Sequence, residues 1–452
     1  MQKLFGTDGM RGEAGRFPLD ASTIETVGRS LAVHLSEKLS RTPVIVIGRD
    51  TRESGPWLER SLLDGVCAVG AEYHSAGVIT TPGVAYLTRA LPADAGIVIS
   101  ASHNPYQDNG IKIFSPSGQK LDDETERLIE SDIREQSATQ KKPSPLSQSE
   151  PNEARALQGR YLDFLTTEIG QGLSLSHLSL VVDCANGAAS KLAPRLLERL
   201  GANVTAINKE PNGRNINQNC GALHIETLQQ RVVTAGADLG IAYDGDADRA
   251  LFVDNDGGLV DGDSALWIFA KYLQKRRELA GEMVVATVMS NVGLEIALHS
   301  RGLRLIRTAV GDKYVLDELL RLGASLGGEQ SGHIIFPRLS LAGDGLITTL
   351  FLLRAMTEAG TTLQKLSEGF TRYPQVLVNV RVKEKRPFSD IEAIQKLADE
   401  TESKLSGQGR LLLRYSGTEP LARVMIEGPN QTEIEQYAND LAHVIRDTLG
   451  AL

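Results

Sequence analysis

Short apolar runs alternate with polar, glycine-containing stretches along most of the chain. Five runs end in polar loops: PVIVIG (43–48) before RDTRESG, GIVIS (96–100) before ASHNP, LVVDC (180–184) before ANGAAS, ADLGIAY (237–243) before DGDADR, and MVVATVM (283–289) before SNVG. Such runs predict buried strands, and the amphipathic stretches after them predict helices. The pattern therefore predicts βα units in parallel or mixed sheets covered by helices on both faces. Ligands bind such sheets beyond the carboxyl ends of the strands.

The length of 452 residues indicates several domains, because single hydrophobic cores stop growing near ~250 to 300 residues. Residues 134–155 are rich in Ser, Gln, Glu and Pro, as in a surface linker, and turn residues cluster at 254–262 and 372–375. Similar loops after three of the runs indicate a repeated α/β unit. We expect four domains with these bounds: residues 1–150, 151–254, 255–371 and 372–452.

Charge and composition narrow the classes of partner. The chain has 48 Lys and Arg against 57 Asp and Glu, a formal net charge of -9, so we expect no general affinity for nucleic acid or an anionic membrane. An anionic ligand must meet a local cluster of positive charge. Cys67, Cys184 and Cys220 lack the spacing of a zinc site or a disulfide framework. With no leader or membrane-spanning stretch in the sequence, we expect a cytoplasmic protein.

The clearest candidate for a metal site follows the run at 237–243. Asp244, Asp246 and Asp248 alternate along DGDADR, and extended backbone would place their carboxylates on one side. Carboxylates this close repel one another unless a hard cation compensates, and oxygen ligands suit Mg²⁺ better here than Ca²⁺. An EF-hand loop is excluded, because Arg249 and Asn255 stand where it needs Gly and Glu. The alternative is a solvated acidic loop.

A candidate nucleophile lies in SASHNP, after the run at 96–100. Ser102 falls at the tip of the predicted loop, with His103 and Lys112 near in sequence, so it could attack an electrophile or carry a phosphoryl group. Ser-His-Asn-Pro also forms turns, and taken alone this structural interpretation is the stronger one. The sequence has no GxSxG elbow and no Walker A motif, so the usual hydrolase and nucleotide-kinase motifs give no support.

A phosphate site is indicated by RYSGTEP (414–420). Backbone N–H groups, two hydroxyls and the guanidinium groups of Arg414 and Arg423 suit a phosphate dianion. The alternative is that Ser416 or Thr418 caps a helix beginning near Pro420.

Two more segments offer contacts to a ligand. The polar side chains of GGEQSGH (327–333) could bond sugar hydroxyls, and the alternative is a tight loop with an exposed His333. FGTDGMRG (5–12) predicts a turn that leaves Arg11 available to an anion.

In their order and separation, these five segments resemble the α-D-phosphohexomutase superfamily over nearly the whole chain. The resemblance implies an α/β fold of four domains around a central cleft, with three related α/β units of mixed sheets and a smaller C-terminal α+β phosphate-binding domain. It also implies that Ser102 is a phosphoserine whose phosphate completes a Mg²⁺ site on Asp244, Asp246 and Asp248. The further residues that it implies are Arg11, His103, Lys112 and Arg249 around the transferring phosphate, with Lys112 a general acid/base candidate; Glu329, Ser331 and His333 at the sugar, with His333 near the proton transfers; and Arg414, Ser416, Gly417, Thr418 and Arg423 at the distal phosphate.

Finer features resemble the glucosamine branch of that family more than its mannose or glucose branches. These are SAS before HNP and Gln330 within GGEQSGH, whereas Lys313 in GDKYV and Ala422 depart from the branch pattern. The branch implies interconversion of glucosamine 6-phosphate and glucosamine 1-phosphate, with glucosamine 1,6-bisphosphate as intermediate and activator, feeding UDP-N-acetylglucosamine synthesis. The implied partner is a small sugar phosphate, and a homodimer stays open.

Other functions also stay open. A phosphoglucomutase or phosphomannomutase would run the same chemistry on a neutral sugar. DGDAD after a strand is also typical of haloacid-dehalogenase-like sugar phosphatases, with Asp244 as nucleophile, but that interpretation leaves Ser102 and RYSGTEP unexplained. A non-catalytic sugar-phosphate sensor would not require the metal and nucleophile residues. Release of inorganic phosphate would favour the phosphatase, and isomer conversion without release would favour a mutase.

Overall fold

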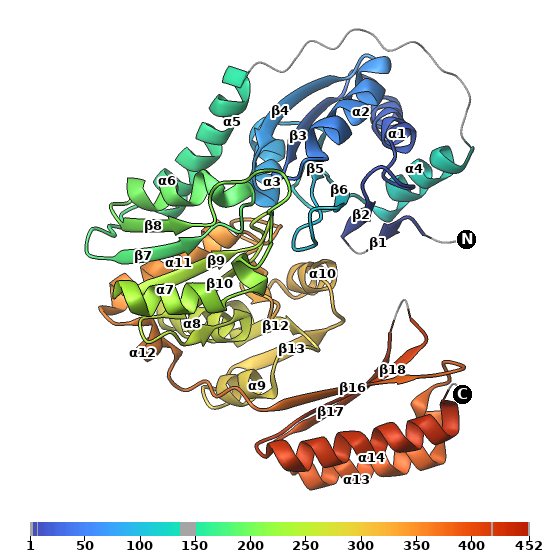
Figure 1. Ribbon diagram of the computed structural model, residues 1–452, viewed down its shortest axis with the longest axis vertical. Coiled ribbons are helices and arrows are strands. Elements are labelled where there is room, and N and C mark those ends of the chain that lie inside the picture. The colour runs from blue at the N-terminus through green and yellow to red at the C-terminus, as the bar shows by residue number, and fades with distance from the viewer. Residues whose placement is uncertain (1–2, 7, 136–150, 417–418, 451–452) are drawn as a thin grey trace. The chain divides into compact units, whose positions relative to one another are not determined.

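The computed structural model describes residues 3–6, 8–135, 151–416 and 419–450 (Figure 1). It divides into two compact units: unit 1 comprises Met1–Val288 and Ile306–Glu368, and unit 2 comprises Met289–Leu305 and Gly369–Leu452. Within the described part of the chain, no helix combines the length and the apolar character needed to cross a membrane.

The first sheet of unit 1 has six strands in the order β1-β2-β6-β5-β3-β4. The strands are β1 (Phe5–Gly6), β2 (Gly9–Glu13), β3 (Val44–Arg49), β4 (Glu72–Val78), β5 (Ala95–Ile99) and β6 (Asp108–Phe114). The accompanying helices are α1 (Ala21–Leu39), α2 (Gly55–Ala68), α3 (Thr81–Ala90) and α4 (Asp123–Glu135). β3 runs parallel to β4 and β5, whereas β6 is antiparallel to β5 and β2. Isoleucines of β3, β5 and β6 form one buried core with α1 and α2.

The second sheet has five strands in the order β11-β10-β9-β7-β8. They are β7 (Ser179–Asp183), β8 (Asn203–Ile207), β9 (Leu239–Tyr243), β10 (Ala250–Asp254) and β11 (Leu259–Val260). The helical segments are α5 (Pro151–Phe164), η1 (Leu165–Ile169), η2 (Ala188–Ser190), α6 (Leu192–Arg199), η3 (Gly221–Leu223) and α7 (Glu226–Ala235). β7 is parallel to β8 and β9, and β9, β10 and β11 pair antiparallel. A domain boundary at residue 254 would therefore separate two paired strands.

The third sheet has four strands in the order β13-β12-β14-β15. They are β12 (Met283–Thr287), β13 (Arg304–Thr308), β14 (Gly327–Gly328) and β15 (Ile334–Ile335). The helical segments of this region of unit 1 are α8 (Gly262–Arg276), η4 (Ala280–Glu282), α10 (Asp312–Leu322), α11 (Gly345–Ala359) and α12 (Leu363–Ser367). The short strands β14 and β15 pair antiparallel and carry the GGEQSGH segment as the loop between them.

Unit 2 contains a three-stranded antiparallel sheet in the order β16-β18-β17. Its strands are β16 (Gln375–Arg381), β17 (Arg410–Tyr415) and β18 (Leu421–Glu427), and its helical segments are α9 (Val292–His299), η5 (Phe388–Asp390), α13 (Glu392–Leu405) and α14 (Gln431–Leu449). α13 and α14 pack on one face of the sheet over a buried apolar core (Figure 1). The helix considered as an alternative near Pro420 is wrong, because the strand β18 follows instead.

The predicted strands are all present, but the predicted βα pattern holds only in part. β3, β7 and β12 are each followed by a helix, as expected. β5 and β9 are not: β5 leads through residues 100–107 into the antiparallel β6, and β9 leads through residues 244–249 into the antiparallel β10. A connection between adjacent antiparallel strands needs no crossover helix. Most of the predicted linker, residues 136–150, lies outside the described residues, and the domain bounds stay predictions.

The packing of α1 against α2 depends on two glycines at their crossing. A Cβ on Gly28 would lie 2.1 Å from the carbonyl oxygen of Leu62, and one on Gly65 would lie 2.0 Å from that of Glu25. Since backbone cannot yield as a flexible side chain can, the crossing excludes any larger residue. These two helices cover the core beneath the first sheet.

Gly28→Ala should lower the free energy of unfolding by ~1–3 kcal/mol, because the two helix backbones must separate. The matched control is Gly159→Ala in α5, where the new Cβ meets nothing within 4 Å. That change should instead raise stability by about 0.5–1 kcal/mol, because alanine favours the helix over glycine. Denaturant unfolding of both variants tests the packing, and equal effects would contradict it.

Candidate active site

Two of the candidate motifs meet in unit 1. SASHNP connects β5 to β6, and DGDADR connects β9 to β10, so both motifs occupy the antiparallel connections described above. The Ser102 hydroxyl donates a hydrogen bond of 2.5 Å to Asp244 Oδ2. Ser102 is buried and has a left-handed backbone, with φ of 51°. The fold therefore brings the candidate nucleophile to the candidate metal site.

The three aspartates of DGDADR form a cluster that fits a cation. Asp244, Asp246 and Asp248 are all buried, and one ligand oxygen from each lies within 4.8 Å of the others. The loop is not extended as expected, because Ala247 has φ of 55° and the chain turns there. The expected convergence of the carboxylates is confirmed.

Two properties of the cluster favour a bound cation. Asp246 Oδ1 is buried and accepts no hydrogen bond from the described residues. Burial, and then repulsion from Asp248 and Asp246, raise the pKa of Asp244 well above its usual value. Asp244, Asp246 and Asp248 can therefore hold a metal ion, which would satisfy the unpaired oxygen and relieve the repulsion.

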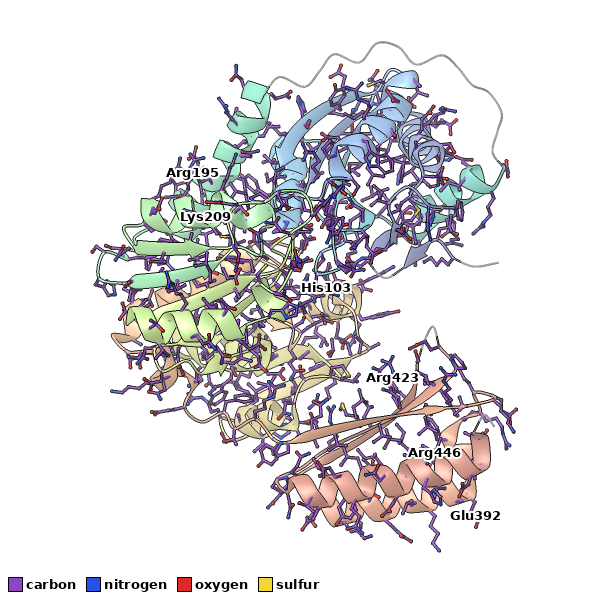
Figure 2. The ribbon with its side chains drawn as sticks, viewed as in Figure 1. His103, Arg195, Lys209, Glu392, Arg423 and Arg446 are labelled. Carbon is purple, nitrogen blue, oxygen red and sulfur yellow. The ribbon has the colours of Figure 1, made fainter. Side chains whose placement is uncertain are left out.

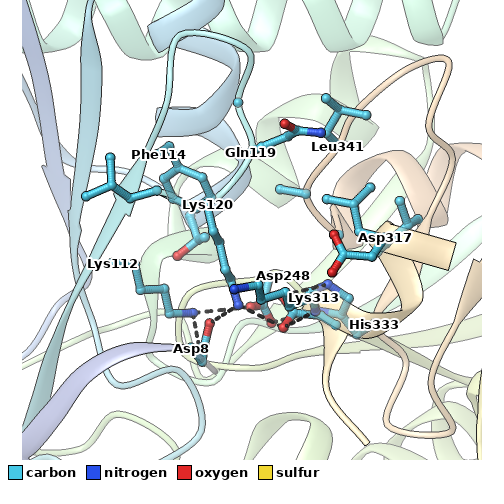
Figure 3. A pocket seen from close by; sticks show the side chains of 18 of the residues that line it. Asp8, Lys112, Phe114, Gln119, Lys120, Asp248, Lys313, Asp317, His333 and Leu341 are labelled. Carbon is cyan, nitrogen blue, oxygen red and sulfur yellow. Dashed lines mark hydrogen bonds and ion pairs between the residues drawn. The ribbon is translucent and has the colours of Figure 1, made fainter. Parts of the chain in front are cut away.

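Lys112 supplies positive charge beside the aspartates. It lies on β6 and is buried, and its ammonium nitrogen is 3.0 Å from Asp246 Oδ2, 3.4 Å from Asp248 Oδ2 and 3.2 Å from Asp8 Oδ2. Burial alone lowers the pKa of Lys112, but the three carboxylates outweigh it and raise the pKa well above its usual value. Lys112 therefore keeps its charge (Figure 3).

Lys120 extends this alternation of charges. Its ammonium nitrogen lies 2.8 Å from Asp8 Oδ1 and 2.7 Å from Asp312 Oδ1, so it joins the loop after β1 to the start of α10. Asp8 also pairs with Arg11. Asp312 Oδ2 in turn lies 3.8 Å from His333 Nε2.

The pKa values of the two histidines of the site are shifted in opposite directions. His333 is 4% exposed, so the alternative of an exposed loop histidine is wrong. Burial lowers its pKa, but Asp248, whose Oδ1 lies 3.7 Å from Nδ1, and Asp312 together raise it to about 9. For His103, burial and then Arg249 and Arg11 lower the pKa to about 4. At neutral pH, His333 is therefore cationic and His103 is neutral.

Two adjoining cavities open at this cluster. The first, of about 440 Å³, is lined by both histidines together with acidic and basic side chains: Lys3, Asp8, Arg11, Asp248, Arg249, Asp312 and Glu329. The second, of about 300 Å³, shares Asp8, Asp248, Asp312 and His333 with the first and has apolar walls that include Phe114 and Leu341 (Figure 3). Cavities of this size accommodate small molecules.

The GGEQSGH loop reaches the first cavity through Glu329 and His333. Glu329 Oε1 accepts a hydrogen bond of 3.1 Å from the Gly311 N–H, and Glu329 Oε2 accepts one of 3.4 Å from the Ser331 hydroxyl. The sequence-predicted residues Arg11, Ser102, His103, Lys112, Arg249, Glu329, Ser331 and His333 thus lie in unit 1 with the three aspartates.

The remaining predicted residues belong to unit 2. Arg414 on β17 and Arg423 on β18 are direct partners in the sheet register. They lie on the face away from α13 and α14, where Figure 2 labels Arg423. Burial and then the charge of Arg423 lower the pKa of Arg414. Two like charges opposite each other destabilise a sheet unless an anion lies between them, so the pair is suited to phosphate.

Ser416, also in this segment, is buried at the end of β17. Gly417 and Thr418 lie outside the described residues.

Some residues of the unit 1 site carried no sequence signal of their own. Lys120 belongs to no motif, and Asp312, within GDKYV, was not among the expected site residues; only the fold brings the two together. Thr81, whose hydroxyl donates 2.6 Å to Asp246 Oδ2, is likewise separated from the aspartate by a long stretch of chain. Asp8 lies within FGTDGMRG, where the expectation considered only Arg11.

Comparisons with known proteins give the family. Four family models match the chain: Phosphoglucomutase/phosphomannomutase alpha/beta/alpha domains I, II and III at residues 2–140, 159–258 and 261–373, and the C-terminal domain at residues 377–444. A phosphoglucosamine mutase of Solibacter usitatus is 50% identical over 99% of both chains. One from Citrifermentans bemidjiense is 46% identical, over 100% of this chain and 99% of its own. The chain belongs to the phosphoglucosamine mutase family.

Solved structures show the same fold. A phosphoglucomutase/phosphomannomutase family protein from Burkholderia thailandensis matches with a TM-score of 0.79 at 23% identity, over 99% of this chain and 98% of its own. The N-acetylphosphoglucosamine mutase of Aspergillus fumigatus, solved with GlcNAc-6P and magnesium, matches with a TM-score of 0.64 at 20% identity, over 98% and 95%. The expected fold of three related α/β units and a smaller C-terminal domain is therefore confirmed, and the chain is an enzyme of the phosphohexomutase class.

Mg²⁺ should raise the unfolding temperature through the aspartate cluster, because a ligand that binds only the folded state stabilises it. At about ten times the dissociation constant the gain is ~1.4 kcal/mol, which for a chain of this length is roughly 1.5 °C. Asp246→Asn should abolish the shift. The matched control is Asp256→Asn, which changes an exposed aspartate on the turn after β10 and should keep it. Thermal unfolding with and without Mg²⁺ measures this, and a shift that survives in Asp246→Asn would contradict the assignment.

Proposed function

We propose that this enzyme interconverts glucosamine 6-phosphate and glucosamine 1-phosphate through a phosphorylated Ser102 and glucosamine 1,6-bisphosphate. The observation that carries the proposal is the 2.5 Å hydrogen bond from the Ser102 hydroxyl to Asp244 within the buried aspartate cluster. A serine at this position can carry a phosphoryl group, and a cation held by the aspartates would balance the charge of that group. The relatives at 44–50% identity, all phosphoglucosamine mutases, support the amino sugar as substrate.

Asp244, Asp246 and Asp248 would hold Mg²⁺, with a phosphate oxygen on Ser102 as a further ligand. When bound, the ion would neutralise charge on the phosphoryl group during transfer. Arg11 and Arg249 line the 440 Å³ cavity together with Asp248, and they would hold the remaining phosphate oxygens. His103, whose Nδ1 is 3.4 Å from the Ser102 hydroxyl, would orient the group.

The sugar hydroxyl that attacks the phosphoryl group must lose a proton, and the hydroxyl released on the return step must regain one. We assign Lys112 as the general acid/base: its ammonium group, 3.0 Å from Asp246 Oδ2 and charged at rest, would give a proton to the departing oxygen and, once neutral, would take the proton of the attacking hydroxyl. His333, which lines the 300 Å³ cavity together with Lys112, would assist these proton transfers.

Substrate binding would use two regions. Glu329 and Ser331 would bond the sugar hydroxyls, and the distal phosphate would bind in the segment that holds Arg414, Ser416, Gly417, Thr418 and Arg423. This segment must bind either phosphate of the bisphosphate, because the bisphosphate must reorient in the site before it returns a phosphoryl group to Ser102. A hinge near residues 371–375 would let the last domain close over the substrate and exclude water. The domain bounds at residues 150, 254 and 371 remain part of this proposal.

The remaining features of the proposal concern cell biology. The product would feed UDP-N-acetylglucosamine synthesis and hence the cell envelope. Three cysteines without a disulfide support a cytoplasmic location. We also propose that the enzyme binds no nucleic acid, because its net charge is -9, and that it can form a homodimer.

A ³¹P NMR time course tests the function. The purified protein is given Mg²⁺, a trace of hexosamine 1,6-bisphosphate and glucosamine 6-phosphate, beside parallel glucose and mannose samples. We expect a growing 1-phosphate resonance without inorganic phosphate, fastest for the amino sugar. Faster conversion of a neutral sugar would move the enzyme to the phosphoglucomutase or phosphomannomutase branch, and inorganic phosphate alone would indicate a phosphatase.

The matched pair of variants for this assay is Ser102→Ala and Ser117→Ala. Ser102→Ala should remove turnover, because no group remains to carry the phosphoryl, while Ser117 is an exposed serine after β6 whose loss should leave the rate unchanged. Wild-type turnover in Ser102→Ala would overturn the assignment of the nucleophile.

A further inference from the structure

The backbone of Ser102 is held as tightly as its hydroxyl. Its carbonyl oxygen accepts two side-chain N–H groups, one from Arg52 at 3.0 Å and one from Asn217 at 2.9 Å. The same two side chains also donate to the carbonyl of Asn104, at 2.9 Å and 3.1 Å. Four hydrogen bonds therefore converge on two carbonyls of the loop that carries the nucleophile.

The Arg52 side chain is buried, and its hydrogen bonds go to other parts of the protein rather than to solvent. Its side chain is 0% exposed and pairs with Asp50, whose Oδ2 lies 2.9 Å from the guanidinium Nε. A third donor of the same guanidinium reaches the carbonyl of Pro105 at 2.6 Å. A buried guanidinium is costly unless its donors are satisfied, and here one carboxylate and three loop carbonyls satisfy them.

Asn217 approaches from the second sheet's side of unit 1. It follows β8 in a loop and has a left-handed backbone, with φ of 59°, and its own N–H donates to the carbonyl of Ala185 at 2.9 Å. This geometry aims the amide nitrogen at the SASHNP loop. Arg52 and Ser102 belong to the region of the first sheet, so the shared carbonyls join two sheets.

Gly245, between two of the aspartates, explains the close approach. A Cβ at Gly245 would lie 2.5 Å from the Ser102 carbonyl oxygen and 2.9 Å from the Asn217 amide nitrogen. The Ser102 carbonyl therefore rests directly on the backbone of the DGDADR loop. On the other side of Gly245, its own carbonyl oxygen accepts the N–H of Ala188 at 2.8 Å.

The N–H of Ser102 is fixed as well. It donates to the Ser100 hydroxyl oxygen at 2.9 Å, and that hydroxyl donates to Asp50 Oδ2 at 2.6 Å. Asp50 therefore anchors both Arg52 and Ser100. With its N–H and its carbonyl both held, Ser102 keeps the left-handed φ of 51° that turns its hydroxyl toward Asp244.

We infer that Arg52 and Asn217 are positioning residues for phosphoryl transfer, which set the distance between the Ser102 oxygen and the aspartate cluster by gripping the Ser102 and Asn104 carbonyls. This inference rests on the proposed function and extends it to residues that touch neither substrate nor metal. Phosphoryl transfer depends on alignment, so a small displacement of Ser102 should slow the chemical step and leave sugar binding intact.

Asn217→Gly is the sharpest test, because glycine can keep the left-handed backbone while the side chain that donates both hydrogen bonds is removed. The matched control is Asn219→Gly, an exposed asparagine of the same loop with φ of 52°. Asn217→Gly should lower kcat about ten- to a hundredfold with KM within about twofold, and Asn219→Gly should change neither. Arg52→Lys, which keeps the charge beside Asp50 but loses the planar fork, should show the same split.

Hydrogen–deuterium exchange supplies a readout that does not need turnover. The backbone N–H groups of residues 100–104 and 106 should exchange faster in Asn217→Gly than in the wild type and in Asn219→Gly. An unchanged kcat, a loss confined to KM, an equal effect of Asn219→Gly, or unchanged exchange would each overturn the inference. If the wild type does not isomerise sugar phosphates, the proposed function fails, and the exchange result still decides whether the grip exists.

Discussion

Three aspartates buried within reach of one another cannot all remain charged without compensating positive charge, and this constraint organises the site. Lys112 forms ion pairs with Asp246 and Asp248 of the cluster. Lys120 forms ion pairs with Asp8 and Asp312, which lie beside it. His333 completes the alternation between Asp248 and Asp312. One oxygen of Asp246 is still left without a donor among the described residues, which leaves room in the balance for a metal ion. The same charges make the centre receptive to a phosphoryl group.

Burying charges of this kind has a large desolvation free energy, so their partners must be held in place by rigid elements. Lys112 stands on a central strand, β6, and the aspartate loop is fixed by its ends in β9 and β10. Thr81, at the start of α3, holds Asp246 through both its hydroxyl and its N–H. The positions of Ser102 and of the three aspartates thus depend on the register of two sheets, because Ser102 bonds to Asp244 and its carbonyl packs on Gly245 of the same loop. The relative positions of Ser102 and the aspartates therefore depend on the packing of these two sheets of unit 1.

The sequence identified what is local and missed what is distant. The serine and the three aspartates were predictable, because each sits in one short motif after an apolar run. The runs also predicted strands, but a helix after β5 and β9 was wrong, because periodicity does not report the antiparallel pairing that β6 and β10 make. The contacts of Lys120 with Asp312 and of Asn217 with Ser102 join residues more than a hundred positions apart, and no spacing in the sequence predicts such a pair. For RYSGTEP, the structure adds the pairing of Arg414 with Arg423 across β17 and β18.

Paramagnetic relaxation measures directly whether a metal ion on the aspartates lies beside a phosphate on Ser102. The enzyme is phosphorylated with glucosamine 1,6-bisphosphate and desalted, and its phosphoserine ³¹P resonance is followed while Mn²⁺, which accepts the same oxygen ligands as Mg²⁺, is added. We predict that a fraction of an equivalent broadens the resonance beyond detection in the wild type and leaves it sharp in Asp246→Asn. A resonance that stays sharp in the wild type while Mn²⁺ is bound, or a phosphate found on a residue other than Ser102, would contradict the account.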